Sequence, residues 1–436
     1  MSNFLPNELI EKLKLHKGFD VEAWKEVHRT GDCAASIRLN PKKLKSVSFS
    51  GTFAVPWCDQ GYYLAEFPFL EDPLYWAGGY RLQEASSMFV AHIVQTIGLR
   101  ECAVRALDIC AGHGIMTSLL SSYLHPDSLL ISNQSDVTQS GILKDGLVRW
   151  GDPIGVMTSN DPSAFGRLPG FFDLMMVDAP SSGIGRLGRD DVESHDWVAA
   201  NVVYYSEQQK RLLAQSVATL KEGGYLIYST YSYFEQENED ILDWLISEHG
   251  FETVQIEIPT SWGIVETISD AQNAFGYRFY PHMIKGDGLF IGVLRRCTPQ
   301  DTFDRPKLNK EESFLSYDAL SEWVMGPDAL TSFLDNDYIH VFPKMYTDDV
   351  KWMGRVLDIR QAGTIIGRWI GDELLPSNDL ALSTYLSEGV DTVELSPDSA
   401  LKLLLRAGIG TKENRGSTNR WCVVQYKGVN ISWIKE

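Results

Sequence analysis

The spacing of apolar residues predicts an α/β domain in the middle of the chain. From about residue 75 to residue 296, short apolar runs alternate with segments of helical spacing, which favours a parallel sheet with crossover helices. A helix is expected from Val202 to Leu220, with Gly223 and Gly224 as its C-terminal stop. The runs expected to form strands are VRALDIC, SLLISN, GVMTSN, DLMMVDA, YLIYST and GLFIGVLRR.

Smaller modules are expected on both sides of this domain. The first forty-five residues have the pattern of two helices and then a strand in AASIRLNP, with Asp20 as the N-cap of the second helix. A polar, charged segment predicts a linker after the α/β domain, and short strands with turn residues follow it. The predicted parts are an N-terminal α+β module at 1–74, the α/β domain at 75–298, the linker at 299–312 and a β-rich module at 313–436.

Composition indicates an ordinary soluble globular protein, with 44% hydrophobic and 22% charged residues. No run approaches the roughly twenty apolar residues that span a membrane, and the N-terminus lacks the pattern of an export signal. The six cysteines are scattered, which predicts reduced thiols in a cytoplasmic protein. No Cys-x-x-Cys or His-x-x-x-His pair occurs, so we expect no metal site.

The charge of the chain is unevenly distributed. A net charge of −19 does not favour a nucleic-acid partner, because phosphate binding relies on Lys and Arg. Distribution matters more than the total, however, and the first fifty residues are locally basic. RNA binding is therefore compatible with one patch. The cations in this segment are Lys12, Lys14, Lys17, Lys25, Arg29, Arg38, Lys42, Lys43 and Lys45.

Two polar loops follow apolar strands: Asp178-Ala179-Pro180-Ser181-Ser182-Gly183 and Ser229-Thr230-Tyr231-Ser232. In an open α/β sheet, ligands bind at the carboxyl ends of the strands. The loops resemble motifs of the NOL1/NOP2/Sun family of RNA cytosine-5 methyltransferases, which carry Asp-Ala-Pro-Cys-Ser-Gly and Ser-Thr-Cys-Ser there. Ser181 and Tyr231 stand where the family has its two cysteines.

Other segments extend this resemblance over nearly the whole chain. It implies a Rossmann-like class I methyltransferase domain, an N-terminal RNA-contacting module and a C-terminal PUA-like RNA-binding module. The implied partner is RNA, of the ribosomal class, and a protein partner is a further option. Asn238 and Arg278 are expected to be buried residues that hold loops rather than catalytic groups. The matching segments are Arg38-Leu39-Asn40-Pro41, Gln83-Glu84-Ala85-Ser86-Ser87-Met88, Asn238-Glu239 and Gly276-Tyr277-Arg278-Phe279-Tyr280-Pro281-His282.

The resemblance also implies an S-adenosylmethionine site. The family has Cys-Ala-Ala-Pro-Gly-Gly-Lys-Thr after its first strand, although a glycine pair there also fits a plain tight turn. The substitution of Met116 for the lysine removes a positive charge. The corresponding residues of this chain are Cys110, Ala111, Gly112, His113, Gly114, Ile115 and Met116.

Three further positions belong to the implied cofactor site. Gln134 stands where a carboxylate would hold the ribose, so weak or absent cofactor binding is expected, but it could equally be an ordinary polar strand end. Asp161 matches the residue that meets the adenine, but it could equally cap the next helix. Asp178 matches the aspartate that holds the target base or the methionyl end of the cofactor.

The family's chemistry implies roles for the two cysteine positions. A thiolate adds to carbon 6 of cytosine and so activates carbon 5, and a second thiol helps to expel the enzyme. Tyr231 would replace the attacking thiol, but a phenol of pKa roughly 10 is rarely ionised and is bulky. Ser181 would replace the releasing thiol and is a weak nucleophile without a base. We therefore expect a catalytically degenerate paralogue.

Two other functions stay open at this point. One is an active S-adenosylmethionine-dependent RNA methyltransferase that acts on a different acceptor or without a covalent intermediate, by positioning and a base. The other is an interaction module in which side chains, including that of Tyr231, fill the old pocket.

Overall fold

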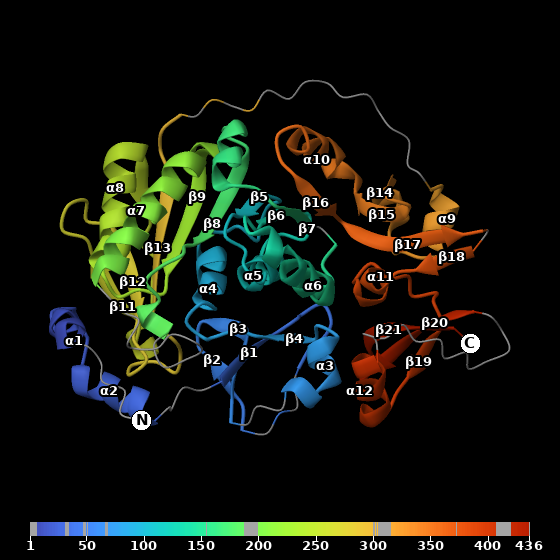
Figure 1. Cartoon of the computed structure of the whole chain (residues 1–436), viewed down its shortest axis with the longest axis horizontal. Helices are drawn as coiled ribbons and strands as arrows, with labels where there is room; N and C mark the ends of the chain where they lie inside the picture. The colour runs from blue at the N-terminus through green and yellow to red at the C-terminus, as the bar shows by residue number, and fades with distance from the viewer. Residues whose placement is uncertain are drawn as a thin grey trace.

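The computed structural model has three parts, coloured in Figure 1 from blue at the N-terminus to red at the C-terminus. The N-terminal part lies below the central domain in this view, and the C-terminal part lies on the right. The structure describes residues 7–30, 35–46, 49, 51–65, 69–153, 155–186, 199–299, 301, 303, 315–371, 373–406 and 420–435.

The central domain is built on one sheet with the strand order β11-β12-β13-β9-β8-β5-β6-β7-β16, and β10 pairs with β13. The pairs along β7-β6-β5-β8-β9 are parallel, whereas β13 is antiparallel to β9. This confirms the predicted α/β fold. The strands are β5 (Arg105–Asp108), β6 (Leu129–Asn133), β7 (Gly155–Thr158), β8 (Phe172–Asp178), β9 (Leu220–Thr230), β10 (Phe251–Thr253), β11 (Val265–Ile268), β12 (Phe275–Phe279) and β13 (Leu289–Arg296).

Helices cover both faces of this sheet, so its strands are buried on both sides. Successive side chains of a strand point to opposite faces. Leu174 and Met176 of β8 therefore pack with α4 and α5, whereas Met175 and Val177 pack with α7 and α8. The helices of the domain are α4 (Phe89–Thr96), α5 (Ile115–Tyr123), α6 (Ser140–Trp150), α7 (Ala199–Ser216) and α8 (Glu239–His249).

All six runs expected to be strands form strands, but the stop expected for the long helix is wrong. Helix α7 ends at Ser216, and a single 3-10 turn leads to β9. Gly223 and Gly224 lie inside β9, at an irregularity where the register against β8 shifts. The positive φ of Gly223, 76°, serves this bulge and does not cap a helix.

The N-terminal part contains two helices and a sheet of order β2-β3-β1-β4. Asp20 caps the second helix as predicted, because its Oδ1 accepts hydrogen bonds from the N–H groups of Glu22 and Ala23, both at 3.0 Å. The elements are α1 (Asn7–Leu13), α2 (Val21–Thr30), β1 (Ala35–Leu39), β2 (Phe53–Val55), β3 (Cys58–Leu64), α3 (Pro73–Trp76) and β4 (Tyr80–Leu82).

Arg38 and Asn40 attach this part to the central domain. The Arg38 side chain is fully buried and donates to Gln83 and, at 2.6 Å, to Ser118 of α5. The Asn40 amide donates to the carbonyl of Trp150 at 2.8 Å and to that of Gly78 at 3.1 Å. The Arg-x-Asn-Pro element was expected in an RNA-contacting module, but these two side chains are buried and hold the two parts together.

The C-terminal part contains two small sheets, of order β14-β15-β17-β18 and β19-β20-β21. Its elements are α9 (Tyr317–Ser321), β14 (Leu330–Asp335), β15 (Tyr338–Pro343), α10 (Thr347–Met353), β16 (Ile359–Ala362), β17 (Thr364–Ile370), β18 (Glu373–Pro376), α11 (Asn378–Leu382), β19 (Thr392–Glu394), α12 (Pro397–Arg406), β20 (Trp421–Tyr426) and β21 (Val429–Lys435). The PUA-like character of this part stays a prediction.

One strand of the C-terminal part completes the central sheet. β16 pairs antiparallel with β7, and Arg105 of β5 forms an ion pair at 3.0 Å with the buried Asp349 of α10. The Asn160 side chain exchanges two further hydrogen bonds with the backbone of Asp358: its amide donates to the carbonyl at 3.1 Å, and its Oδ1 accepts the N–H at 2.9 Å. The sequence did not predict this docking, which joins the last third of the chain to the central domain.

Three further expectations concern membrane-spanning helices, metal sites and the predicted linker. Among the described residues, no helix has the length and apolarity needed to cross a membrane, and no cluster of His, Cys, Asp and Glu could bind a metal ion. The linker predicted at 299–312 lies outside the described residues except for 299, 301 and 303.

Replacing Asn40 tests the junction between the N-terminal part and the central domain. Asn40→Ala leaves two buried carbonyls without their donor, so the free energy of unfolding should fall by about 2–4 kcal/mol. Chemical denaturation measures this change. Gln272→Ala, at an exposed position, is the control and should change stability by less than about 0.5 kcal/mol. Equal effects of the two substitutions would contradict the structural role of Asn40.

Candidate functional site

Polar groups gather at the carboxyl ends of the parallel strands, beginning with Asp108 at the end of β5. Its side chain is fully buried, and its Oδ2 accepts a 2.6 Å hydrogen bond from the Thr117 hydroxyl. Its Oδ1 has no hydrogen-bond partner within the described structure. Burial disfavours the carboxylate and raises the pKa of Asp108 to about 7. The sequence analysis did not select this residue, although it ends a predicted strand.

The glycine-bearing loop lies between β5 and α5. Gly112 and Gly114 have φ of 52° and 75°, which other residues rarely adopt. A Cβ on Gly112 would have no heavy atom within 4 Å, so the loop backbone faces open space there. Arg81 of β4 holds the loop from the other side, donating to the carbonyls of His113 at 2.6 Å and Gly114 at 2.8 Å.

The side chains of this loop contribute unequally to the site. Ala111 is buried, and Met116, at the family's lysine position, is 4% exposed and packs into the core. Ile115 is half-buried, and the His113 side chain is exposed. Burial and the charge of Asp108 raise the pKa of Cys110, so its thiol stays protonated. Open backbone at Gly112 is the feature that best fits a ligand.

The predicted ribose and adenine positions are occupied by local hydrogen bonds. The Gln134 amide oxygen accepts from the N–H of Asp136, within its own turn. Asp136 caps the following 3-10 turn. Asp161 accepts from the N–H of Ser163 at 2.9 Å and caps its own 3-10 turn, as the alternative interpretation expected. Each carboxylate serves its local turn.

Asp178 at the end of β8 lies in register with Ser229 of β9, and the Ser229 hydroxyl donates to it at 2.7 Å. Burial raises the pKa of Asp178 to about 6, against the hydrogen bond from Ser229. The nearby charge of Glu84 acts in the same direction as burial. Asp178 is thus a carboxyl group that changes its protonation near neutral pH.

Tyr231 and Ser181 are neighbours. The Ser181 hydroxyl accepts the N–H of Tyr231 at 3.2 Å. The Tyr231 ring packs against the core on the α4 side, with the Arg186 guanidinium 5.1 Å from its centroid, and its hydroxyl donates to Glu84 at 3.3 Å. Burial and the negative charges of Glu84 and Asp178 raise the pKa of this phenol well above its ordinary value. The structure therefore brings both cysteine positions together around a neutral phenol.

Glu237 ties the two loops together. The carboxylate accepts the N–H of Ser182 at 2.8 Å and its hydroxyl at 2.6 Å, and it also accepts the hydroxyl of Ser232 at 2.5 Å. Asn238 is fully buried and holds Thr230 and the carbonyl of Ser232, as expected. Arg278 is also buried as expected and donates to Glu239. The role of Glu237 was missed, although it directly precedes the matching segment Asn238-Glu239.

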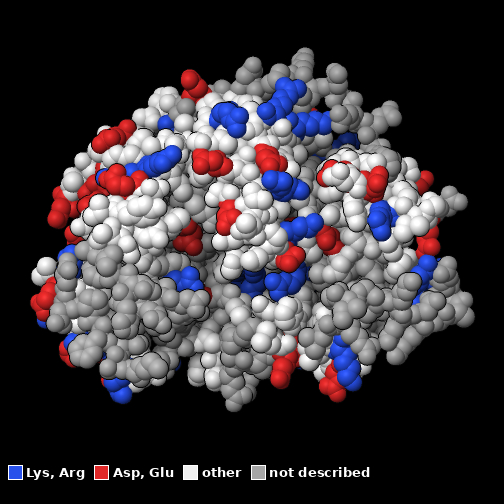
Figure 2. Space-filling model, viewed as in Figure 1, with Lys and Arg blue, Asp and Glu red and all other residues white. Residues whose placement is uncertain are grey.

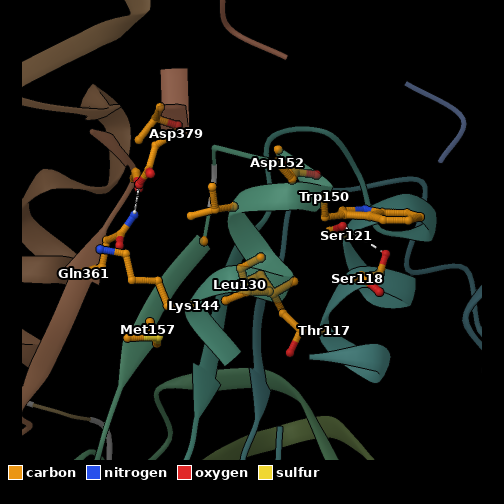
Figure 3. A pocket seen from close by; sticks show the side chains of 16 residues that line it. Thr117, Ser118, Ser121, Leu130, Lys144, Trp150, Asp152, Met157, Gln361 and Asp379 are labelled. Carbon is orange, nitrogen blue, oxygen red and sulfur yellow. Dashed lines mark hydrogen bonds between the residues drawn. The ribbon is translucent and has the colours of Figure 1, made fainter. Parts of the chain in front are cut away.

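A cavity of about 50 Å³ lies away from these loops, between α5, α6 and β7 and the C-terminal part (Figure 3). Leu130, Trp150 and Met157 form part of its apolar wall, and Gln361 donates to Asp379 at 3.4 Å on the opposite side. None of the residues that line it was predicted as a site residue. It is an interdomain cavity, separate from the carboxyl ends of β8 and β9.

The strand order and the polar loops at the strand ends define the class of Rossmann-like, S-adenosylmethionine-dependent methyltransferases. A family model described as 16S rRNA methyltransferase RsmB/F matches residues 98–295, and one for the N-terminal domain of 16S rRNA methyltransferase RsmF matches residues 5–85. Over these two stretches, which together span most of its length, the chain is similar to RsmB/RsmF-type members of the NOL1/NOP2/Sun family.

Individual proteins show the same relationship. The chain is 27% identical to ribosomal RNA small subunit methyltransferase F of Aeromonas salmonicida and 23% identical to that of Shewanella piezotolerans. Each match covers 92% of this chain and 87% of the relative. Among solved structures, NSun6 from Pyrococcus horikoshii has a TM-score of 0.55 at 15% identity, covering 67% of this chain and 98% of that one. A methyltransferase homolog protein from the same organism has a TM-score of 0.53 at 22% identity, covering 67% and 100%.

The site fits S-adenosylmethionine at the loop and less well at the ribose. The open backbone at Gly112 and the carboxyl group of Asp178 are in place to meet a ligand. At the ribose position, the amide of Gln134 offers no negative charge and is engaged in its own turn. The donor set thus supports the methionyl end of the cofactor more strongly than its nucleoside end.

Asp108 should make stability depend on pH. Its pKa, about 7 when folded, exceeds the roughly 3.9 of an unfolded Asp. The unfolded chain therefore loses this proton first, and stability falls as pH rises from about 4 to 7, by about 2–4 kcal/mol. In Asp108→Asn this loss should be absent, which urea denaturation at several pH values measures. The exposed Asp270→Asn should keep the wild-type dependence. Parallel curves for Asp108→Asn and the wild type would contradict the assignment.

Proposed function

We propose that this protein is a catalytically degenerate member of its family, which binds ribosomal RNA and does not form 5-methylcytosine. The observation that carries the proposal is Tyr231 at the position of the attacking thiol, with its ring packed against the core and its hydroxyl on Glu84. The relatives are named as methyltransferases of small-subunit ribosomal RNA, which supports RNA of this class as the partner. The cytoplasmic location stays a prediction.

The environment of Tyr231 opposes nucleophilic attack. The covalent route needs an anionic nucleophile at carbon 6 of the base. Burial and two neighbouring acids disfavour the phenolate, since a second negative charge would lie beside Glu84 and Asp178. The ring also occupies volume that a flipped cytosine would need. Charge and space therefore both argue against the family's reaction.

Ser181 does not supply the missing thiol chemistry. Its hydroxyl is engaged with the backbone of Tyr231, and a serine requires an adjacent base to become a nucleophile. The hydroxyl thus fixes the loop that carries the tyrosine. Both former cysteine positions now contribute to the same packed arrangement.

The loop backbone at 110–115 and Asp178 are the residues that would hold S-adenosylmethionine, which supplies the methyl group when bound. Asp178 also favours a second function, a methyltransferase without a covalent intermediate. A carboxyl group with a pKa of about 6 is suited to accept a proton from an acceptor amine or hydroxyl near neutral pH. This second function requires that S-adenosylmethionine binds, whereas the proposed degenerate protein does not require the cofactor.

Restoring both thiols tests the proposed loss of activity. The wild type should form no 5-methylcytosine on ribosomal RNA, measured by mass spectrometry of digested RNA. Tyr231→Cys with Ser181→Cys removes the bulky ring and supplies both thiols, so activity should appear at least about tenfold above background. Tyr231→Phe is the control and should stay inactive. If the wild type were as active as the double variant, the proposal would be wrong.

Restoring the ribose carboxylate tests the cofactor site separately. Gln134→Glu supplies a charged acceptor for the ribose hydroxyls, so the affinity for S-adenosylhomocysteine should rise about tenfold, or about 1.4 kcal/mol. Calorimetry measures both proteins. Gln139→Glu adds the same charge nearby, at a residue that contacts Gln134, and should change little. Equal gains in the two variants would show a general charge effect and contradict the assignment of position 134.

A further inference from the structure

Most cations of the basic N-terminal segment are engaged within the protein. Exposed ion pairs join Lys14 to Glu11, Lys25 to Glu22 and Arg29 to Glu26. Lys42 pairs with Asp152, and Lys43 donates to the carbonyls of Ala77 and Arg149. Arg38 is buried. The patch expected from the sequence therefore does not provide the free positive charge that an RNA strand needs.

Uncompensated positive charge occurs instead around Arg81 and Arg149. Within the part of the chain that the structure describes, neither has a carboxylate at ion-pair distance, although the protein carries a net charge of −19. Burial and the positive charges of Arg38 and Arg149 lower the pKa of Arg81 to about 9. Figure 2 shows Lys and Arg side chains near the middle of one face, over the junction of α6 with β4.

These two arginines line a hollow of about 240 Å³. Its wall is formed by α3, β4, the glycine-bearing loop and α6, so it lies where the N-terminal part meets the central domain. A Cβ on Gly146 would come within 3.0 Å of the Arg81 guanidinium and 2.7 Å of the His113 carbonyl. The absence of a side chain at Gly146 therefore lets α6 approach Arg81. Other lining residues are Tyr75, His113, Ile142 and Trp150.

The two guanidinium groups are held in place from different elements. Arg81 uses two of its five N–H groups on the loop carbonyls. Arg149, one helical turn beyond Gly146, lies 5.5 Å from the Tyr75 ring and 5.7 Å from the Trp76 ring. Its Nε makes only a long, 3.3 Å hydrogen bond to the carbonyl of Asp145. Both side chains are thus positioned before any ligand arrives and keep donors for one.

We infer that this hollow binds a phosphodiester group of a single-stranded RNA segment, held between Arg81 and Arg149. A guanidinium pair matches phosphate oxygens in charge and geometry, and an anion between them relieves their mutual repulsion. The exposed His113 ring and Ile142 at the rim offer a surface for an adjacent base. The inference rests on the RNA binding proposed above and assigns it a place outside the former catalytic pocket.

Fluorescence polarisation with a short labelled single-stranded RNA of mixed sequence tests the site on the full chain. Arg149→Gln should weaken binding about five- to tenfold at low salt and reduce the salt dependence by about one phosphate contact. Ile142→Asp adds a negative charge at the exposed rim and should also weaken binding. Arg295→Gln is the matched control, because Arg295 likewise lies over a tyrosine ring, 5.9 Å from that of Tyr225, and should bind as the wild type.

Three outcomes would overturn the site: unchanged RNA binding in both variants of the hollow, equal weakening in Arg295→Gln, or a hollow that takes only a free nucleotide. The last is tested with adenosine 5′-monophosphate, whose binding would then depend on Arg149 while RNA binding would not. The proposed loss of activity is judged independently. If the wild type forms 5-methylcytosine and its RNA binding needs Arg149, only the proposed loss of activity is contradicted. If the wild type is inactive and its RNA binding does not need Arg149, only the proposed phosphate site is contradicted.

Discussion

The pairing of β8 with β9 is the constraint on which the site depends. Because Asp178 and Ser229 lie in register, the two loops leave the sheet side by side. Glu237 then joins them through Ser182 and Ser232. None of these contacts uses Ser181 or Tyr231, which stand at the family's cysteine positions. These contacts therefore hold the two loops side by side whether position 231 carries a thiol or a phenol.

Acidic and basic groups lie in different regions. The interior of the site gathers acids, with Asp108 and Asp178 both shifted towards the protonated form. Arg81 and Arg149, which have no carboxylate at ion-pair distance among the described residues, lie outside it, in the hollow. Arg81 connects the two regions, since it holds the carbonyls of the glycine-bearing loop. A phosphate drawn to Arg81 would thus act on the loop that would hold the cofactor, without any contact with position 231.

Strong local patterns in the sequence predicted the core of the fold. Continuous apolar runs located the central strands because both faces of these strands are buried. The polar loops at the strand ends resemble the family's motifs, and this resemblance identified Asp178 and Tyr231 as candidate site residues. β16 was missed because it has only four residues, Ile359–Ala362, of which two are polar, and only pairing with β7 makes them a strand. Gly223 was misassigned because a bulge and a helix stop have the same local signal.

Contacts between residues far apart in the sequence determine several features of the site that local sequence patterns could not predict. Arg38 and its neighbours look like an RNA-binding patch in sequence, but Arg38 and Asn40 have partners far along the chain, at Ser118, 80 positions from Arg38, and Trp150, 110 positions from Asn40. Likewise, nothing near Arg149 in sequence indicates that β4 delivers a second guanidinium to the same hollow. Tyr231 follows the same logic: its fit depends on Glu84, 147 residues away, and on Arg186. Because acid, cation and ring stabilise one another, replacing Tyr231 alone by cysteine would leave a partly emptied pocket, so the two loops are expected to act as a coupled pair when they are substituted.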